Sequence, residues 1–398
     1  MSTHRISVIS DNDVLTGSVR YSPSKSLWFS AMASGALIGG ACTASWTALA
    51  VFVLTTGWVL LFGHSLGSHR KLIHNSFQCP RWLEYFLVYC GVQVGLAGPL
   101  GLLRQHELRD FAQRQRHCHS YLRHGESFWR DYWWQVHCVL RFDREPALQL
   151  EDRIADNRFY AFLERTWMLQ QLPPALVLYA CGGWAFVWWG VCARITAGIL
   201  GHWLIGHFAH NHGDMSHVVR GAAVQGRNVR FTSLLTMGEC WHNNHHAYPG
   251  SARLGLYPGE WDPGWWVLQA LCLVKVVWSV RLPSDLPPRP ELLALARSGS
   301  PCWEPQRNVP PAWMLDSEYG NWQLEGPAKW LPISILQAVA RGQFNLTTGP
   351  RLSLRYGGRT VAGLPALAAS FLLARGALAS HAWLYSCALA AERMRIAR

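Results

Sequence analysis

The feature that most constrains this fold is a run of residues without charge, Leu27 to Gly63. As a single helix its 37 residues would be about 55 Å long, whereas the hydrocarbon core of a bilayer is about 30 Å thick. Two membrane spans that turn near Thr43 to Trp46 fit this length better. A second apolar stretch runs from Pro173 to about Ala209 and is interrupted only by Arg194. It predicts a second hairpin.

Composition supports a membrane protein. Half of the chain is hydrophobic, only 15% is charged, and the 22 tryptophans are typical of a chain that meets the lipid–water boundary. The 11 cysteines form no CxxC pair, which favours reduced structural thiols over a zinc ribbon or a disulfide framework. The first 26 residues are polar and lack the pattern of a secretory signal, so we expect a cytoplasmic N-terminus.

The distribution of arginine predicts the orientation. Both expected turns are poor in Lys and Arg, whereas residues 70–165 and those beyond 220 are Arg-rich and are expected inside. Trp82 to Leu103 is long enough to cross, but crossing would place His64 and the histidines after His106 on opposite sides. We expect it to lie in the interface or within a cytoplasmic cap, and we expect Trp265 to Val280 to form an interfacial amphipathic helix.

Histidines gather near the ends of the apolar stretches, where ionisable side chains are costly to bury and indicate function. In GECWHNNHHAYPG, the spacing i, i+3, i+4 places three imidazoles on one helical face, and imidazole is the commonest metal ligand. Three other segments are similar: GHSLGSHRKLIH, RQHELRDFAQRQRHCHSYLRH and GHWLIGHFAHNHG. Their histidines are His64, His69 and His74; His106, His117, His119 and His124; His202, His207, His210 and His212.

An HxxxxH box after one span, a second histidine region and the HxxHH box in GExWHNxHH resemble the membrane-bound fatty acid desaturases, and most of all their acyl-CoA (delta-9, stearoyl-type) branch with its bacterial members. The resemblance covers about Leu27 to Pro288, and the third box with its downstream PG and DPGWW is its most specific part. It implies an all-α integral membrane fold of four transmembrane helices, in two hairpins, under a cytoplasmic helical cap that holds a histidine-rich di-iron site. It also implies an oxidoreductase that uses two iron ions and O2 to introduce a cis double bond into a saturated fatty acyl chain.

Carried over residue by residue, the resemblance implies five metal ligands directly: His64, His69, His242, His245 and His246. His210 matches the extra histidine that the fourth span contributes in the family. The second box departs from the family's HxxHH. One alignment keeps only His106, followed by Arg109 and Asp110, and another keeps only His119. We expect His106, His119 and His124 to supply the missing nitrogens. Gly206 stands where stearoyl-type enzymes have an Asn that reaches a metal through water, and either His207 compensates or it packs on its helix.

Acidic residues beside the boxes are candidate acceptors for the distal N–H of the imidazoles, which would fix their orientation. They are Asp110, Asp131 and Glu239, and each could instead be a solvated charge. The Trp-rich segment from Phe128 to Gln135 either lines an acyl tunnel or belongs to an interfacial aromatic belt. The net charge of +12 suits anionic headgroups or the phosphates of an acyl carrier.

We expect three parts: a polar cytoplasmic N-terminus (1–26), a desaturase domain (27–288) and an unassigned, partly disordered C-terminal extension (289–398). The expected spans are about 27–43, 46–63, 174–191 and 195–210. The resemblance places the protein in a bacterial inner membrane with the active site on the cytoplasmic side. Expected partners are membrane lipid, an acyl substrate from the membrane or from acyl-CoA, and a separate electron donor, either ferredoxin or a cytochrome b5-like protein with its reductase, since no HPGG-like haem motif is present. We expect no nucleic-acid partner.

Two other functions fit the same residues. A fatty acyl or lipid hydroxylase could use the same scaffold, and the incomplete second box fits a catalytically inactive metal-binding membrane protein.

Overall fold

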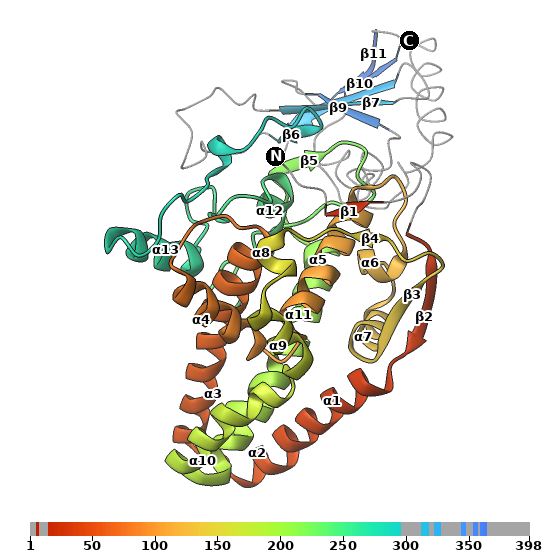
Figure 1. The fold of residues 1–398 in the computed structure, drawn as a ribbon. Coiled ribbons are helices and arrows are strands. Elements are labelled where there is room, and N and C mark those ends of the chain that lie inside the picture. The colour runs from red at the N-terminus through yellow and green to blue at the C-terminus, as the bar shows by residue number, and fades with distance from the viewer. Residues whose placement is uncertain are drawn as a thin grey trace.

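The computed structural model describes residues 5–7 and 15–295 together with five strands between residues 312 and 363. The described chain is mostly helical (Figure 1). Two helices are long and apolar enough to cross a membrane, Trp46–Ile73 and Leu169–Asn211.

The first hairpin joins a helix of residues 23–42 to the helix Trp46–Ile73. The first arm comprises α1 (Pro23–Ser34), η1 (Gly35–Gly39) and α2 (Gly40–Cys42), and the second comprises α3 (Trp46–Trp58) and η2 (Val59–Ile73). The turn lies where the sequence places it, and the Ser45 hydroxyl caps α3 by accepting a hydrogen bond from the Ala48 amide at 3.2 Å. The helix of the second arm is longer than the apolar run that predicted it: η2 continues for ten residues beyond Gly63.

The second hairpin turns earlier than expected. It comprises η3 (Leu169–Gln171), α10 (Leu172–Val187), η4 (Trp188–Ala193) and α11 (Arg194–Asn211). The break lies at Gly182 and Gly183 inside α10, where Gly183 has φ +62°, a conformation that glycine adopts without strain. The expected break between residues 191 and 195 is corrected accordingly, because the backbone at Ala193 and Arg194 is helical and a polar side chain does not end a helix. Arg194 is buried and donates to Gln171 Oε1 at 2.7 Å.

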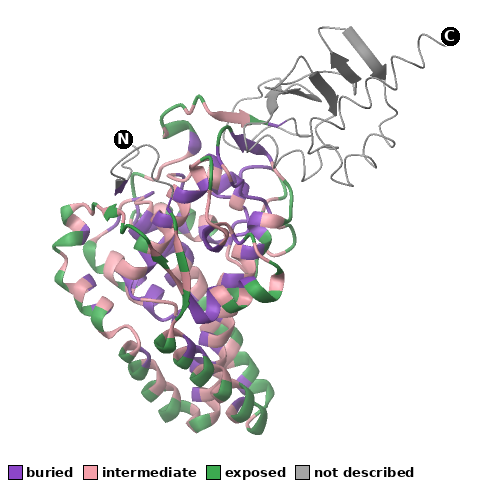
Figure 2. Cartoon of the chain, turned by 90° about the vertical axis from the view of Figure 1, so that its right-hand side faces the viewer, coloured by how far each residue is buried: buried purple, intermediate pink, exposed green. Residues whose placement is uncertain are grey.

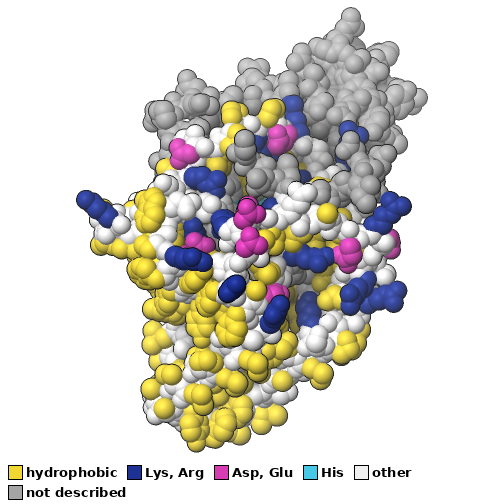
Figure 3. Space-filling model, viewed as in Figure 1, with side chains coloured by type: hydrophobic (Ala, Val, Ile, Leu, Met, Phe, Trp, Pro, Cys, Tyr) yellow, Lys and Arg dark blue, Asp and Glu magenta, His cyan; other side chains and the backbone are white. Residues whose placement is uncertain are grey.

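The lower half of the molecule exposes apolar side chains, as expected of helices that face lipid (Figures 2 and 3). Burial is concentrated in the upper half of the helical part, where the shorter helices gather. The exposed apolar residues of the two hairpins include Leu37, Ile38, Trp46, Val53, Leu54, Leu176, Val177 and Trp184.

Two helices of the upper half come from the region of Trp82 to Leu103. They are α4 (Arg81–Val92) and α5 (Pro99–Arg114), so this region is not one continuous helix. Helix α4 packs closely on η2 because glycines face it: a Cβ at Gly63 would lie 2.2 Å from Cys90 O, and one at Gly67 would lie 2.1 Å from Leu87 O. Small residues four apart allow helix backbones this approach in membrane proteins. This close packing fixes η2, which carries the first histidines.

The remaining helices are short and complete the upper half. They are α6 (Ser120–Arg123), α7 (Phe128–His137), α8 (Asp152–Ala155), α9 (Arg158–Thr166), α12 (His242–Ala247), α13 (Pro263–Leu273) and η5 (Pro283–Asp285). The expected interfacial helix over residues 265–280 corresponds to α13, which exposes Trp266 and Leu273.

The fold is not all-α, which corrects the expected class. Three pairs of antiparallel strands join distant segments: β1 (Ile6–Ser7) with β4 (Ala147–Leu148), β2 (Gly17–Tyr21) with β3 (Cys138–Phe142), and β5 (His217–Val219) with β6 (Leu292–Ala294). Residues 17–21 thus pair with residues 138–142, the strand that directly follows α7, and this pairing satisfies backbone N–H and C=O groups of both segments.

The C-terminal part contributes a five-stranded antiparallel sheet in the order β11-β10-β8-β7-β9. Its strands are β7 (Ala312–Ser317), β8 (Trp322–Pro327), β9 (Phe344–Thr347), β10 (Ser353–Tyr356) and β11 (Arg359–Gly363). The rest of the extension, on which the expectation of partial disorder falls, lies outside the described residues.

Candidate metal centre

The first histidine group joins three helices. His69 lies in η2 and His74 is the residue that caps its C-terminus, while His106 comes from α5 and His245 from α12. One nitrogen of each lies within 4.8 Å of the corresponding nitrogens of the others, and the Nε2 atoms of His69 and His245 are 3.4 Å apart. Four imidazoles from segments up to 176 residues apart therefore converge on one point.

The wide turns of η2 explain why His69 and His74 belong together. The His74 amide donates to His69 O at 3.1 Å, so residues five apart are one turn apart, as in a π-helix. Their rings then lie 4.8 Å apart between centroids. In an α-helix, residues five apart would point about 140° away from each other. The local widening thus creates a ligand pair, in keeping with the frequent use of π-turns at functional sites.

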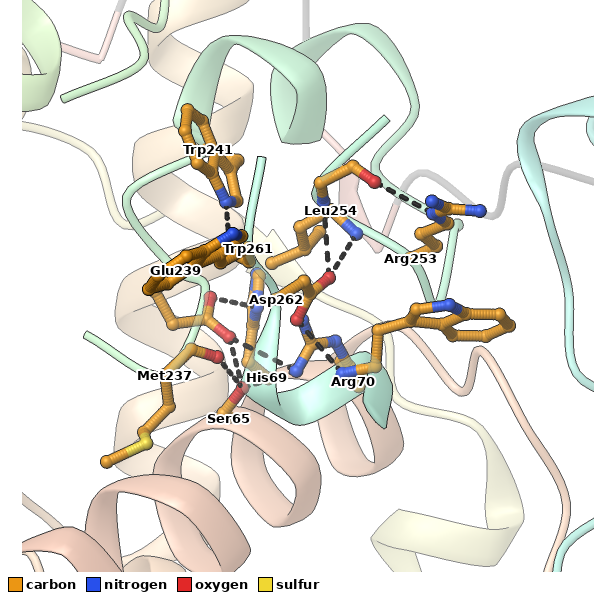
Figure 4. Close-up of polar contacts among 12 residues, drawn as sticks. Ser65, His69, Arg70, Met237, Glu239, Trp241, Arg253, Leu254, Trp261 and Asp262 are labelled. Atoms are coloured by element: carbon orange, nitrogen blue, oxygen red, sulfur yellow. Dashed lines mark hydrogen bonds and ion pairs between the residues drawn. The ribbon is translucent and has the colours of Figure 1, made fainter. Parts of the chain in front are cut away.

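A buried charged network holds the first group from behind (Figure 4). His69 Nδ1 lies 2.6 Å from a Glu239 carboxylate oxygen, and Ser65 Oγ donates to the other oxygen at 2.6 Å. Arg70, which is 1% exposed, donates to Asp262 Oδ1 at 2.7 Å and contacts Ser65. Burial alone would raise the pKa of Glu239, but His69 and Arg70 lower it to about 2. Glu239 is therefore an anion that orients His69. Its place three residues before His242 had pointed to that histidine as its partner.

The second group contains His210 from α11 and His242 and His246 from α12. Their Nε2 atoms meet: His242 lies 3.1 Å from His210 and 3.0 Å from His246. His210 Nδ1 donates to Gly206 O at 2.7 Å, so the proton is on Nδ1 and the lone pair is on Nε2. Helix α12 thus serves both groups, with His245 in the first and its neighbours in the second.

Two asparagines fix the histidine-bearing helix, and the sequence analysis did not single them out. Asn243 Oδ1 accepts from the amides of Ser216 and His217 at 2.7 and 2.8 Å. Asn244 Nδ2 donates to Leu254 O at 2.8 Å. Because both amides are buried and bonded to backbone, they set the rotation of α12 and so aim the imidazoles between them. The segment HNNHH therefore contains histidines of both groups together with the two asparagines that position them.

The donor sets of both groups fit metal ions. Two nitrogens bound to one ion at about 2.1 Å, at angles of about 90° to 110°, lie about 3.0 to 3.4 Å apart. The observed Nε2 separations of 3.0, 3.1 and 3.4 Å fall in this range. Burial lowers the pKa of His106 and of His246 to about 4, in both cases against the opposing effect of Asp110. These two imidazoles are therefore neutral at pH 7, the form that binds a metal.

A third buried group lies beside the second and contains His124, Asp131 and His207. Asp131 Oδ2 accepts from Nδ1 of His124 and of His207, each at 2.9 Å, and from the Trp203 indole at 3.0 Å. This leaves Nε2 of His124 as its lone-pair nitrogen, and the Arg109 guanidinium contacts it. The His124 ring stacks on His210 with centroids 5.6 Å apart. Asp131 thus orients His124 next to the second group.

Gly206 makes room for His124. A Cβ at position 206 would lie 2.6 Å from His124 Nε2. The His124 imidazole therefore occupies the space that an Asn side chain at position 206, as in the stearoyl-type enzymes, would fill. His207, the other candidate replacement, instead bonds Asp131.

Two expected ligands lie outside all three groups. His64 packs against His202 with ring centroids 5.5 Å apart, although its spacing from His69 forms an HxxxxH box. His119 is the N-cap of α6, and its Nδ1 accepts from the Tyr121 amide at 3.1 Å. His74, which the sequence analysis left aside, takes the place expected for His64. The signal for it was present, since the spacing of five occurs twice, at 64–69 and at 69–74.

Comparison with known proteins shows related enzymes over about three fifths of this chain. It is 33% identical over 251 residues to an sn-1 stearoyl-lipid 9-desaturase of Synechocystis sp., covering 61% of this chain and 74% of that protein. It is 35% identical over 248 residues to an sn-2 palmitoyl-lipid 9-desaturase of Nostoc sp., covering 59% and 83%. The chain belongs to the fatty acid desaturase family. No protein-family model matches the chain.

The relatives of this desaturase include enzymes named for different acyl carriers. An acyl-CoA 5-desaturase of Anemone leveillei is 31% identical over 251 residues, covering 61% of this chain and 75% of that protein. Membership in the family makes the chain an oxidoreductase, but the names of its relatives include both acyl-lipid and acyl-CoA enzymes.

Proposed function

We propose that this chain is an O2-dependent di-iron desaturase that introduces a cis double bond into a saturated fatty acyl chain, held either on CoA or in a lipid. One observation carries the proposal: in a chain of the desaturase family, the imidazole nitrogens of two neighbouring histidine groups converge within 4.8 Å of one another in each group, with Nε2 separations down to 3.0 Å. The groups share α12, so the two ions that they would hold are neighbours. Two irons suit a reaction in which O2 takes two electrons from a donor and two hydrogens from the acyl chain.

In this proposal His69, His74, His106 and His245 hold one iron. His210, His242 and His246 hold the other. His124 lies next to this second group, stacked on His210 and packed against Gly206. When bound, the irons supply the activation of O2. The protein's part is to keep the imidazoles neutral and oriented, through Glu239 behind His69 and Asp131 behind His124. His64 and His119, which the resemblance and the second box suggested, are left without a ligand role.

We also propose that four spans carry the site at their cytoplasmic ends, under a cap formed by the shorter helices. The two hairpins, their exposed apolar side chains and the position above them of α12, which carries histidines of both groups, support this arrangement (Figure 1). A reporter at Ser45 should appear outside and one at Ser120 inside. The opposite labelling would contradict the topology.

The substrate would enter from the bilayer, because the acyl chain has no polar group to guide it and the exposed apolar faces of the hairpins meet lipid. Selectivity for chain length would then come from an apolar path to the irons. The electron donor would be a separate protein, either ferredoxin or cytochrome b5-like. A bacterial inner membrane is the proposed location.

The test is the fatty-acid profile of a host that expresses the chain, with double-bond positions mapped by mass spectrometry and compared with the His246→Ala variant. The expected result is a new unsaturated acyl chain in the parent alone. A hydroxylated chain in its place would assign the alternative reaction to the same scaffold. An unchanged profile, together with no O2 consumption by iron-loaded protein supplied with reductant, would contradict the proposed activity.

A further inference from the structure

Residues 230–239 form a loop that leads directly into α12. Its two ends are tied together, because the Val229 amide donates to Cys240 O at 3.0 Å. Compact surface loops with closed ends frequently have a function of their own. Glu239, the last residue of the loop, is the carboxylate that contacts His69 behind the first histidine group. The loop is therefore joined directly to the metal centre.

The tip of this loop exposes three large apolar side chains within five residues. Phe231 is 98% exposed, Leu235 75% and Leu234 51%. Residues 231–237 carry no charge. Phe231 also has φ +68°, a left-handed backbone conformation that is uncommon for a bulky residue and that persists only where the surrounding structure imposes it. An exposed apolar cluster held in this way indicates a surface that is covered in the working protein.

The hydroxyl groups of the tip bond within the loop. Thr232 Oγ1 donates to Val229 O at 2.8 Å, and Thr236 Oγ1 donates to Thr232 O at 2.9 Å. The charge that precedes the tip, Arg230, pairs with Asp214 at 2.5 Å. A segment that enters lipid must satisfy its polar groups internally, because no water is available there. These internal bonds favour lipid, rather than water or a polar protein surface, as the phase around the tip.

The loop lies between the two hairpins. At its start, Val229 and Ile205 of α11 pack on the same buried cluster. At its end, Ser65 Oγ lies 3.2 Å from Met237 O, a contact drawn in Figure 4. The Met237 side chain reaches α3, because a Cβ at Gly57 would lie 3.9 Å from Met237 Cε. Since α3 belongs to a helix that is long and apolar enough to cross a membrane, the loop packs against a candidate span.

Exposed apolar side chains adjoin the loop at both of these contacts. On α3, Leu54 and Trp58 flank Gly57, and both are exposed. At the base of the loop, Trp241 Nε1 donates to Trp261 O at 2.6 Å, and the Trp261 side chain is itself exposed. Tryptophan is enriched at the boundary between lipid and water. The exposed tip is therefore continuous with the surface that the hairpins present to lipid.

We infer, on the basis of the proposed four-span arrangement, that the tip of loop 230–239 inserts among the acyl chains of the bilayer beside α3. The occupant of this surface is membrane lipid, rather than a second copy of the chain or another protein. Because the loop carries Glu239 and leads into α12, its insertion fixes the histidine groups close to the bilayer surface, where the acyl substrate would enter.

Photocrosslinking of the full chain tests this inference. The photoreactive amino acid p-benzoylphenylalanine replaces Phe231 or Leu235 in separate variants, and each purified protein is reconstituted into phosphatidylcholine vesicles and irradiated. Leu54 is the positive control, since it is exposed on a proposed span. Glu145 is the negative control, because it is exposed and pairs with another exposed charge, Arg104. Mass spectrometry detects adducts with lipid, gel electrophoresis detects adducts between copies, and gel filtration checks that each variant is folded.

The expected result is a mass increase of one phospholipid at positions 231, 235 and 54, and none at position 145. Lipid adducts at 54 but at neither 231 nor 235 would overturn the inference and leave the four-span arrangement intact. Adducts between copies at 231 and 235, in place of lipid adducts, would overturn it as well and would assign the tip to a protein interface. A lack of lipid adducts at all three positions would overturn the arrangement on which the inference rests.

Discussion

The two histidine groups share α12 but differ in what surrounds them. The first has four imidazoles and a carboxylate, Glu239, bonded directly behind one of them. The second has three imidazoles, with His124 stacked on one of them and Arg109 in contact with His124. The first group therefore has one imidazole more than the second. His124, from the second histidine region, stacks on His210 of the second group but belongs with Asp131 and His207.

The largest expected effects come from removing one ligand of each group. His245→Ala should empty the first site and His246→Ala the second, leaving about one iron per protein in each case and reducing desaturation more than about 100-fold. Iron analysis and Mössbauer spectroscopy of the folded variants measure this. The exposed His117→Ala serves as the control and should keep two irons. Full activity and unchanged iron in both ligand variants would contradict the assignment of α12.

The two HxxxxH spacings give the next comparison. His74→Ala should lower iron content in the first site, because its ring lies 4.8 Å from those of His69 and His245. His64→Ala should keep two irons, since His64 packs on His202 instead. Iron per folded protein decides between them. The reverse outcome would restore the first spacing as the metal-binding box.

The sequence predicted the composition of the site better than its geometry. The spacing of His242, His245 and His246 predicted that all three imidazoles point at one place, whereas the structure divides them: His245 lies in the first group and the other two in the second. His74 was missed because ordinary α-helical geometry separates residues five apart, and only the wide turns of η2 bring them together. Likewise, the first hairpin turn followed from length, whereas the second depended on two glycines whose φ angles are not visible in composition.

A smaller effect should come from the space that His124 occupies. Gly206→Ala places a methyl group 2.6 Å from His124 Nε2, whereas Gly201→Ala, on the same helix, meets nothing within 4 Å. Overpacking of this kind costs about 1–3 kcal/mol. We therefore expect Gly206→Ala to weaken iron binding in the second site alone by about tenfold, and Gly201→Ala to leave it unchanged. Chelator titration followed by Mössbauer spectroscopy measures the two sites separately. Equal loss from both sites would contradict the placement of His124 beside the second group only.

The smallest effect concerns His119, a residue of the second histidine region that lies outside the described groups. Its Nδ1 accepts the Tyr121 amide at the start of α6, so His119→Ala should lower stability by about 1 kcal/mol, as for other N-caps, while two irons remain bound. His119→Asn, which restores an acceptor at the cap, should recover most of that loss in thermal unfolding followed in detergent. Loss of iron from folded His119→Ala, with no recovery in His119→Asn, would instead make His119 a ligand. His119 would then join His106 as a second ligand from this region of the chain.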